Sequence, residues 1–184
     1  MRLMQLNNQI TQQKRNLKMT INQTNTDFHP ASHDRPLLEQ DIDAYHAKEK
    51  LPEPAACPQC GAIFHKGHWQ WGAVPNDVHR KICPACHRIN NQSPAGFVTL
   101  EGDFLLTHHE DIIHLIRNQE QHQRAEHPLK RIMAIEQQKD SVLVTTTDIH
   151  LARGIGEALR HAYQGELDLK YNADEHLLRV HWSR

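Results

Sequence analysis

The four cysteines of this 184-residue chain are the residues whose types and spacing most directly indicate chemistry. They form two C-x-x-C pairs, Cys57 with Cys60 and Cys83 with Cys86, separated by residues 61–82. Each C-x-x-C turn presents two thiolates, and two such turns supply the four soft ligands of a tetrahedral zinc site. Because this set uses every cysteine in the chain, no thiol remains for catalysis. The spacing therefore predicts one structural zinc ion.

Disulfide bonding and thiol redox chemistry fit these cysteines less well than zinc does. A disulfide framework requires an oxidising compartment, and the N-terminal segment lacks the apolar stretch of a secretory signal. A thioredoxin-type C-x-x-C motif occurs singly beside a βαβ unit. Iron in the same four-sulfur cage is the remaining alternative. Since a catalytic zinc keeps one position open and four cysteines close the shell, His65, His68 and His87 are expected on the surface.

The segment between the two cysteine pairs combines aromatic and basic residues. It contains Trp69 and Trp71, two of the three tryptophans in the chain. Aromatic rings can stack on bases while nearby cations contact phosphates. The predicted nucleic-acid-binding residues are Lys66, Trp69, Trp71, Arg80, Lys81 and Arg88. Alternatively, Trp69 or Trp71 packs the ribbon against the C-terminal domain, because a small zinc domain needs large apolar side chains.

The charge and hydropathy of the chain limit its classes of partner. Its formal net charge is −1, so no overall field attracts nucleic acid. Binding must instead use a local patch such as residues 57–92, where Asp77 is the only acidic residue against four cations. No run of about 18 apolar residues is present to span a bilayer. We therefore expect a cytoplasmic protein with no membrane partner.

The elements that must position these residues follow from composition and periodicity. The first 50 residues are polar and interrupted by Pro30 and Pro36, which predicts a mostly disordered tail with at most a short helix around 37–50. The predicted divisions are this tail over 1–50, a zinc ribbon over 51–96 and an α+β domain over 97–184.

The α+β domain is predicted to contain a helix followed by a ββαββ unit. The apolar run over 97–106 predicts a strand or hairpin edge, and Thr107 with Glu110 forms a capping-box pair ahead of a helix over 108–126. Asp148 is the predicted N-cap of the later helix. The ββαββ elements are predicted, in order, at 131–136, 141–146, 149–163, 166–171 and 178–182. The sheet face away from the helix is expected to carry Arg131 or Arg179, according to register.

Gly154 and Gly156 do not indicate a nucleotide site. The chain has no G-x-x-x-x-G-K-[ST] motif, and both glycines fall in the middle of a predicted helix. Their expected role is to permit close packing of this helix on the sheet.

Several motifs resemble a family of uncharacterised bacterial zinc-ribbon proteins: CPQCGAIFHKGHWQW, CPACHRI, THHEDI, HPLKRIMAI, TTTDIHLARGIGEAL and AYQGEL. The resemblance covers nearly all of residues 43–182. The ribbon, helix and "TT-D-x-x-LA" element also look like the amino-terminal part of the archaeal and eukaryotic large-ribosomal-subunit export adaptor related to nonsense-mediated decay. That similarity implies binding of ribosomal or structured RNA. This chain departs from the adaptor in having only two C-x-x-C knuckles.

Three hypotheses for function follow. The first is a ribosome-associated or RNA-binding module without enzymatic activity. The second is a protein-interaction adaptor that docks a partner through a free sheet edge and the polar helix over 108–126. The third is an enzyme with a second metal held by His108, His109 and either Glu110 or Asp111, which is disfavoured because adjacent helical residues point in different directions.

Overall fold

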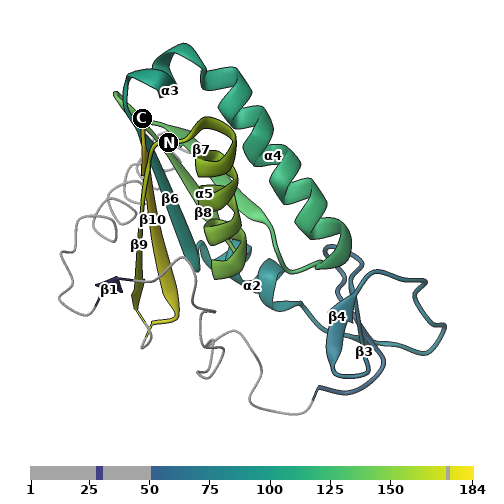
Figure 1. Cartoon of the computed structure of the whole chain (residues 1–184). Coiled ribbons are helices and arrows are strands. Elements are labelled where there is room, and N and C mark those ends of the chain that lie inside the picture. The colour runs from purple at the N-terminus through teal and green to yellow at the C-terminus, as the bar shows by residue number, and fades with distance from the viewer. Residues whose placement is uncertain (1–27, 31–50, 173–174) are drawn as a thin grey trace, which may run out of the picture.

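The computed structural model describes residues 28–30, 51–172 and 175–184. These residues form two sheets, a small one near the cysteines and a larger one that carries the helices (Figure 1). The predicted short helix around 37–50, and the rest of the predicted tail apart from residues 28–30, lie outside the described residues. The mixed α+β class predicted from the sequence is confirmed.

The small sheet has the strand order β4-β3-β2-β5. Its strands are β2 (Ala55–Ala56), β3 (Ile63–His65), β4 (His68–Gln70) and β5 (His79–Arg80). Lys66 and Gly67 join β3 to β4 with φ values of 52° and 80°, the pair of positive angles that a tight hairpin requires. The Glu53 carboxylate accepts hydrogen bonds from the backbone N–H groups of both turn residues, at 2.8 and 3.2 Å.

The large sheet has the strand order β1-β9-β10-β6-β8-β7. Its strands are β1 (His29–Pro30), β6 (Gly96–Glu101), β7 (Ile132–Gln137), β8 (Ser141–Thr146), β9 (Glu166–Asn172) and β10 (Leu177–Ser183). Both predicted hairpins are present as β7–β8 and β9–β10. The apolar run over 97–106, predicted as a strand or hairpin edge, forms a strand only as far as Glu101, and residues Asp103–Thr107 form a helix instead. This strand joins the two hairpins, because β6 pairs parallel with β10 and antiparallel with β8.

Four helices accompany the sheets in the described part of the chain: α2 (Pro84–Asn91), α3 (Asp103–Thr107), α4 (His109–Glu126) and α5 (Ile149–Tyr163). Helix α5 covers one face of the large sheet, and α4 lies beside α5 with its C-terminal end toward the small sheet (Figure 1). None of the helices in the described ranges is long and apolar enough to cross a bilayer.

The two predicted helix caps have different outcomes. Asp148 caps α5 as predicted, since its carboxylate accepts a hydrogen bond from the Leu151 N–H at 2.9 Å. The predicted capping box before α4 is wrong. The Thr107 hydroxyl donates to the Phe104 carbonyl at 3.1 Å, and the N-cap of α4 is His108, whose side chain makes no capping bond. The reason is that the unpredicted α3 precedes α4 directly and engages Thr107.

The core lies between α5 and the large sheet. Val98 of β6 and Trp182 of β10 are both fully buried there. A Cβ added to Gly156 of α5 would lie 2.6 Å from Val180 Cγ1, so the close helix–sheet approach requires glycine at this position. The predicted packing role is confirmed for Gly156. Gly154 instead faces the side chain of Gln119 on α4.

Candidate metal centre and ribbon surface

The four cysteines meet at one point, as their spacing predicts. Cys57 and Cys60 come from the turn between β2 and β3, while Cys83 and Cys86 come from the start of α2. Their ligand atoms all lie within 4.8 Å of one another, and three of the four residues are buried. Four thiolates at this separation form a donor set suited to one metal ion, and the all-sulfur tetrahedral set fits zinc.

Backbone groups at the two turns point toward the sulfurs. The Cys83 N–H donates to Cys57 Sγ, and the Cys86 N–H donates to Cys83 Sγ, both at 3.4 Å. Gly61 (φ 78°) closes the first turn by donating its N–H to the Cys57 carbonyl at 2.9 Å. These donors stabilise negative charge on sulfur, which is the state that binds a metal ion.

Burial and hydrogen bonding shift the pKa values of the thiols in opposite directions. Burial alone would raise the pKa of Cys57, but hydrogen bonds from backbone groups, first that of Cys83, outweigh it and lower this pKa to about 7. Burial raises the pKa of Cys83 well above its ordinary value, and the charges of the neighbouring sulfurs raise it further. A metal ion must therefore displace protons when it binds.

Arg131, just before β7, is the member of the site that the sequence did not reveal. Either Arg131 or Arg179, according to register, was expected on the open face of the sheet. Arg131 is only 6% exposed, and its guanidinium donates to Cys86 Sγ at 3.2 Å and approaches Cys83 Sγ at 3.8 Å. Burial alone would lower the pKa of Arg131, but hydrogen bonds to the sulfurs raise it above the ordinary value, so the side chain stays charged. One buried cation thus opposes the charge of the thiolates.

A short network holds Arg131 in this position. Its Nε donates to the Pro128 carbonyl at 2.7 Å, and its backbone N–H donates to the Thr147 hydroxyl at 3.0 Å. The same hydroxyl donates to the Leu129 carbonyl at 2.6 Å, and Leu129 packs against the cysteine cluster. The cysteine cluster therefore connects the small sheet to the segment between α4 and β7.

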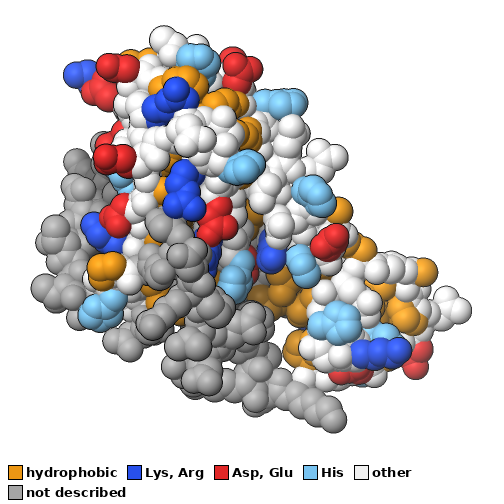
Figure 2. Space-filling model, viewed as in Figure 1, with side chains coloured by type: hydrophobic (Ala, Val, Ile, Leu, Met, Phe, Trp, Pro, Cys, Tyr) orange, Lys and Arg blue, Asp and Glu red, His pale blue; other side chains and the backbone are white. Residues whose placement is uncertain are grey.

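Four of the predicted nucleic-acid-binding residues reach the surface. Lys66, Arg80 and Lys81 are exposed, and the side chain of Trp71 is 37% exposed. Trp71 also contacts the α+β domain, because its Nε1 donates to the Arg124 carbonyl of α4 at 2.7 Å. The face of the small sheet seen in Figure 2 carries histidine, Lys or Arg, and acidic side chains side by side.

The other two predicted residues are Arg88, which is buried, and Trp69, which is partly buried. Arg88 is only 4% exposed and donates to the Ser93 carbonyl at 3.0 Å, which corrects its expected place on the binding surface. The reason is that Arg88 lies on the inner side of α2, a helix that the sequence analysis did not predict. Trp69 packs against the cysteine cluster and lies 5.5 Å from the ring of Phe64. Trp69 therefore packs within the ribbon, and Trp71 is the tryptophan that contacts the C-terminal domain, as the alternative packing role requires of one of the two.

The histidines near the cysteines and at the start of α4 stand apart from the metal centre. His65, His68 and His87 are exposed, as predicted. The His108 ring stacks on Phe104 at 3.8 Å, and His109 Nε2 lies 2.8 Å from Gln137 Oε1. Within the ranges that the structure describes, the cysteines are the one group of three or more potential ligands close enough to hold a metal ion.

No family model, curated protein or solved structure matches this chain. The family resemblance of the cysteine-containing motifs thus stays a prediction.

Proposed function

We propose that this chain is a zinc-ribbon protein that associates with ribosomal or other structured RNA and catalyses no reaction. One zinc ion would hold the turn after β2 and the start of α2 together. Four protein sulfurs fill a tetrahedral shell, so no position is left for a reacting water or substrate. The metal then supplies folding free energy, about 10–16 kcal/mol in comparable small sites.

The observation that carries the proposal is the exposed cationic and aromatic surface on the ribbon, defined here as residues 51–92. Lys66 at the hairpin turn and Arg80 and Lys81 at the end of β5 are exposed, and Trp71, which follows β4, is partly exposed. Lysine and arginine side chains contact phosphates, and an exposed indole can stack on a base. With an overall charge of −1, such binding must depend on this local surface.

The alternative function is a protein adaptor, and β7 is the observation that favours it. This strand lies at an edge of the large sheet, where an extended peptide can pair with free backbone groups. The first N–H of β7, that of Ile132, already donates to the Glu120 carboxylate at 2.8 Å. This internal contact shortens the available edge, so we favour RNA.

Co-sedimentation with ribosomal particles from the native host tests the proposal. We expect the zinc-loaded protein to enter the ribosomal fractions at low salt, and nuclease treatment to return it to the light fractions. A variant with Lys66, Arg80 and Lys81 all changed to glutamine should bind more weakly, with a salt slope reduced by about 0.7–0.9 per lost phosphate contact. Lys139→Gln, on an exposed turn of the large sheet, is the matched control.

Two results would count against RNA binding. One is protein that remains in the light fractions at low salt. The other is a set of co-purified proteins that nuclease does not change, which would favour the adaptor.

A further inference from the structure

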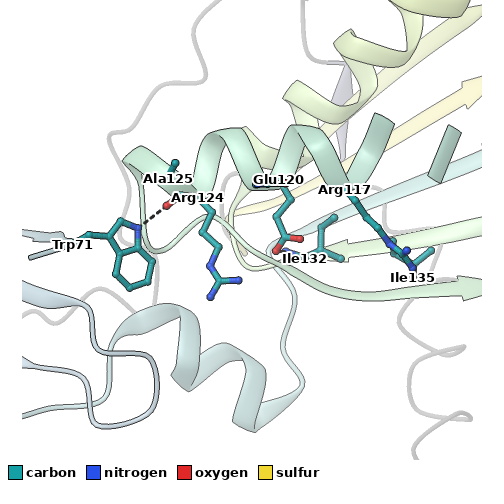
Figure 3. A pocket seen from close by; sticks show the side chains of 8 residues that line it. Trp71, Arg117, Glu120, Arg124, Ala125, Ile132 and Ile135 are labelled. Atoms are coloured by element: carbon teal, nitrogen blue, oxygen red, sulfur yellow. Dashed lines mark hydrogen bonds between the residues drawn. The ribbon is translucent and has the colours of Figure 1, made fainter. Parts of the chain in front are cut away.

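A groove of about 630 Å³ runs between α4 and the edge strand β7, and the ribbon closes one end of it (Figure 3). Trp71 lies at the ribbon end, and Arg117 and Ile135 lie toward the other end. Ile132 and Ile135 of β7 provide a partly buried apolar wall. We propose that this groove binds an unpaired segment of RNA, with a base stacked on Trp71 and phosphates on Arg124 and Arg117. The inference rests on the proposed RNA-binding function and adds a site that includes Trp71 of the ribbon and is otherwise lined by residues of α4 and β7.

The two arginines have a spacing and exposure that suit consecutive contacts along a strand. They are seven residues apart on α4, so they lie on one face of the helix about 10.5 Å apart along its axis. Both are exposed, and no carboxylate in the described ranges lies within ion-pair distance of either guanidinium. They are therefore available to bind phosphate groups.

The carboxylate of Glu120, the acidic residue in the groove lining, is bonded to the backbone of β7. The carboxylate accepts the Ile132 N–H at 2.8 Å, and Figure 3 shows it turned toward that residue. Two arginines against one glutamate leave the groove lining with a net charge of +1. An anionic ligand is thus favoured over a cationic one.

The indole of Trp71 is fixed rather than free to rotate. Its Nε1 donates to the Arg124 carbonyl at 2.7 Å, while the side chain is still 37% exposed. The Arg124 guanidinium carbon lies over one face of the ring, 6.0 Å from the ring centroid. A base stacked on the opposite face of the indole would therefore have Arg124 beside the stack, where it can contact a neighbouring phosphate. An oriented ring loses little freedom on binding, which favours affinity.

These features favour RNA over an acidic peptide as the occupant. A peptide added to β7 would need the backbone donors of that edge, and the Ile132 N–H is already bonded to Glu120. A nucleotide needs only a ring face, cations and an apolar wall, all of which the groove presents. Trp71 belongs to both the ribbon and the groove, so one RNA molecule can contact both surfaces.

The test uses the full zinc-loaded chain and a fluorescently labelled single-stranded RNA of about ten nucleotides, within the usual range of site sizes. Trp71→Ala should weaken binding by about 5- to 150-fold through the lost stacking. Trp71→Phe keeps a ring and loses the Nε1 hydrogen bond, so it should retain most of the affinity. The pair separates stacking from a structural effect of the Arg124 contact.

The arginines are tested by the double variant Arg117→Gln/Arg124→Gln, with Arg160→Gln on α5 as the matched control. We expect the double variant to lower the salt slope of single-strand binding by about 1.4 and the control to leave it unchanged.

Three outcomes would overturn the groove assignment. If the triple ribbon variant weakens RNA binding and the groove variants do not, RNA binding stands without the groove. If the unmodified protein binds no RNA in either assay, the proposed function fails as well. If an acidic peptide binds in a way that the double variant abolishes, while RNA binding is unaffected, the occupant is a peptide.

Discussion

Replacing Arg131 with methionine should weaken metal binding and destabilise the fold together. Methionine keeps much of the buried volume but removes the positive charge and its donors. Four thiolates around a divalent ion carry a net charge of −2, and Arg131 reduces this charge to −1 within the buried cluster. In the variant the sulfurs lose their 3.2 and 3.8 Å partners, and the Pro128 carbonyl loses its 2.7 Å donor.

The expected size of both effects follows from these contacts. Breaking a buried charge pair by removing one partner costs about 3–5 kcal/mol. For a chain of this size each kcal/mol lowers the melting temperature by about 2–4 °C, which gives a decrease of about 6–20 °C. Removing a residue that supports metal ligands typically lowers the metal affinity by about 10- to 100-fold.

Competition with a chromophoric zinc chelator measures the affinity, and thermal unfolding followed by circular dichroism measures the stability. Arg131→Lys should give intermediate values, because lysine keeps the charge but not the planar set of donors. Arg153→Met is the matched control: this side chain is 15% exposed and forms a 2.7 Å ion pair with Glu157, away from the cysteines. It should lower the melting temperature and leave the zinc affinity unchanged.

The reasoning about Arg131 is refuted if Arg131→Met binds zinc as tightly as the unmodified protein. Equal losses of zinc affinity in Arg131→Met and Arg153→Met would also refute it, because the effect would then be one of general stability.

Three further predictions concern packing, capping and pH. Gly156→Ala should cost about 1–3 kcal/mol of stability in thermal unfolding, since its Cβ would lie 2.6 Å from Val180 Cγ1. Gly154→Ala should be neutral or stabilising, because its nearest neighbour is the end of a flexible side chain at 3.3 Å; an equal loss in both would contradict this account. Asp148→Ala should cost about 1 kcal/mol and Asp148→Asn much less, and unchanged stability in the alanine variant would exclude a capping role. Zinc affinity should fall as the pH is lowered, by about tenfold per pH unit for each proton displaced, because burial raises the pKa of Cys83 and its thiol must lose a proton to bind. A chelator competition series that shows no pH dependence would be inconsistent with this linkage.

Local patterns in the sequence predicted much of this protein because they constrain neighbouring residues. The C-x-x-C spacing brings two sulfurs together within one turn, so the ligand set could be predicted before any fold was known. A polar turn before a strand rich in Val and Thr predicted the first hairpin, and the alternation of apolar and polar residues predicted the second. Helical spacing placed the last helix at 149–163, the bounds that α5 has. The same patterns missed α2, which has only eight residues, and α3, whose five residues fall mostly in the apolar run predicted as a strand or hairpin edge.

By itself the sequence therefore determined the four-cysteine cluster, the mixed α+β class and the approximate bounds of α4, α5 and strands β7 to β10. Only the tertiary structure decided which distant residues meet. Arg131 lies 45 residues from Cys86 along the chain, and nothing in its local sequence distinguishes it from a surface arginine. Arg88 was buried, and Trp71 was brought against α4, by the same packing. The physical reason is that periodicity and turn chemistry act over a few residues, whereas contacts between elements depend on how the whole chain buries its apolar surface.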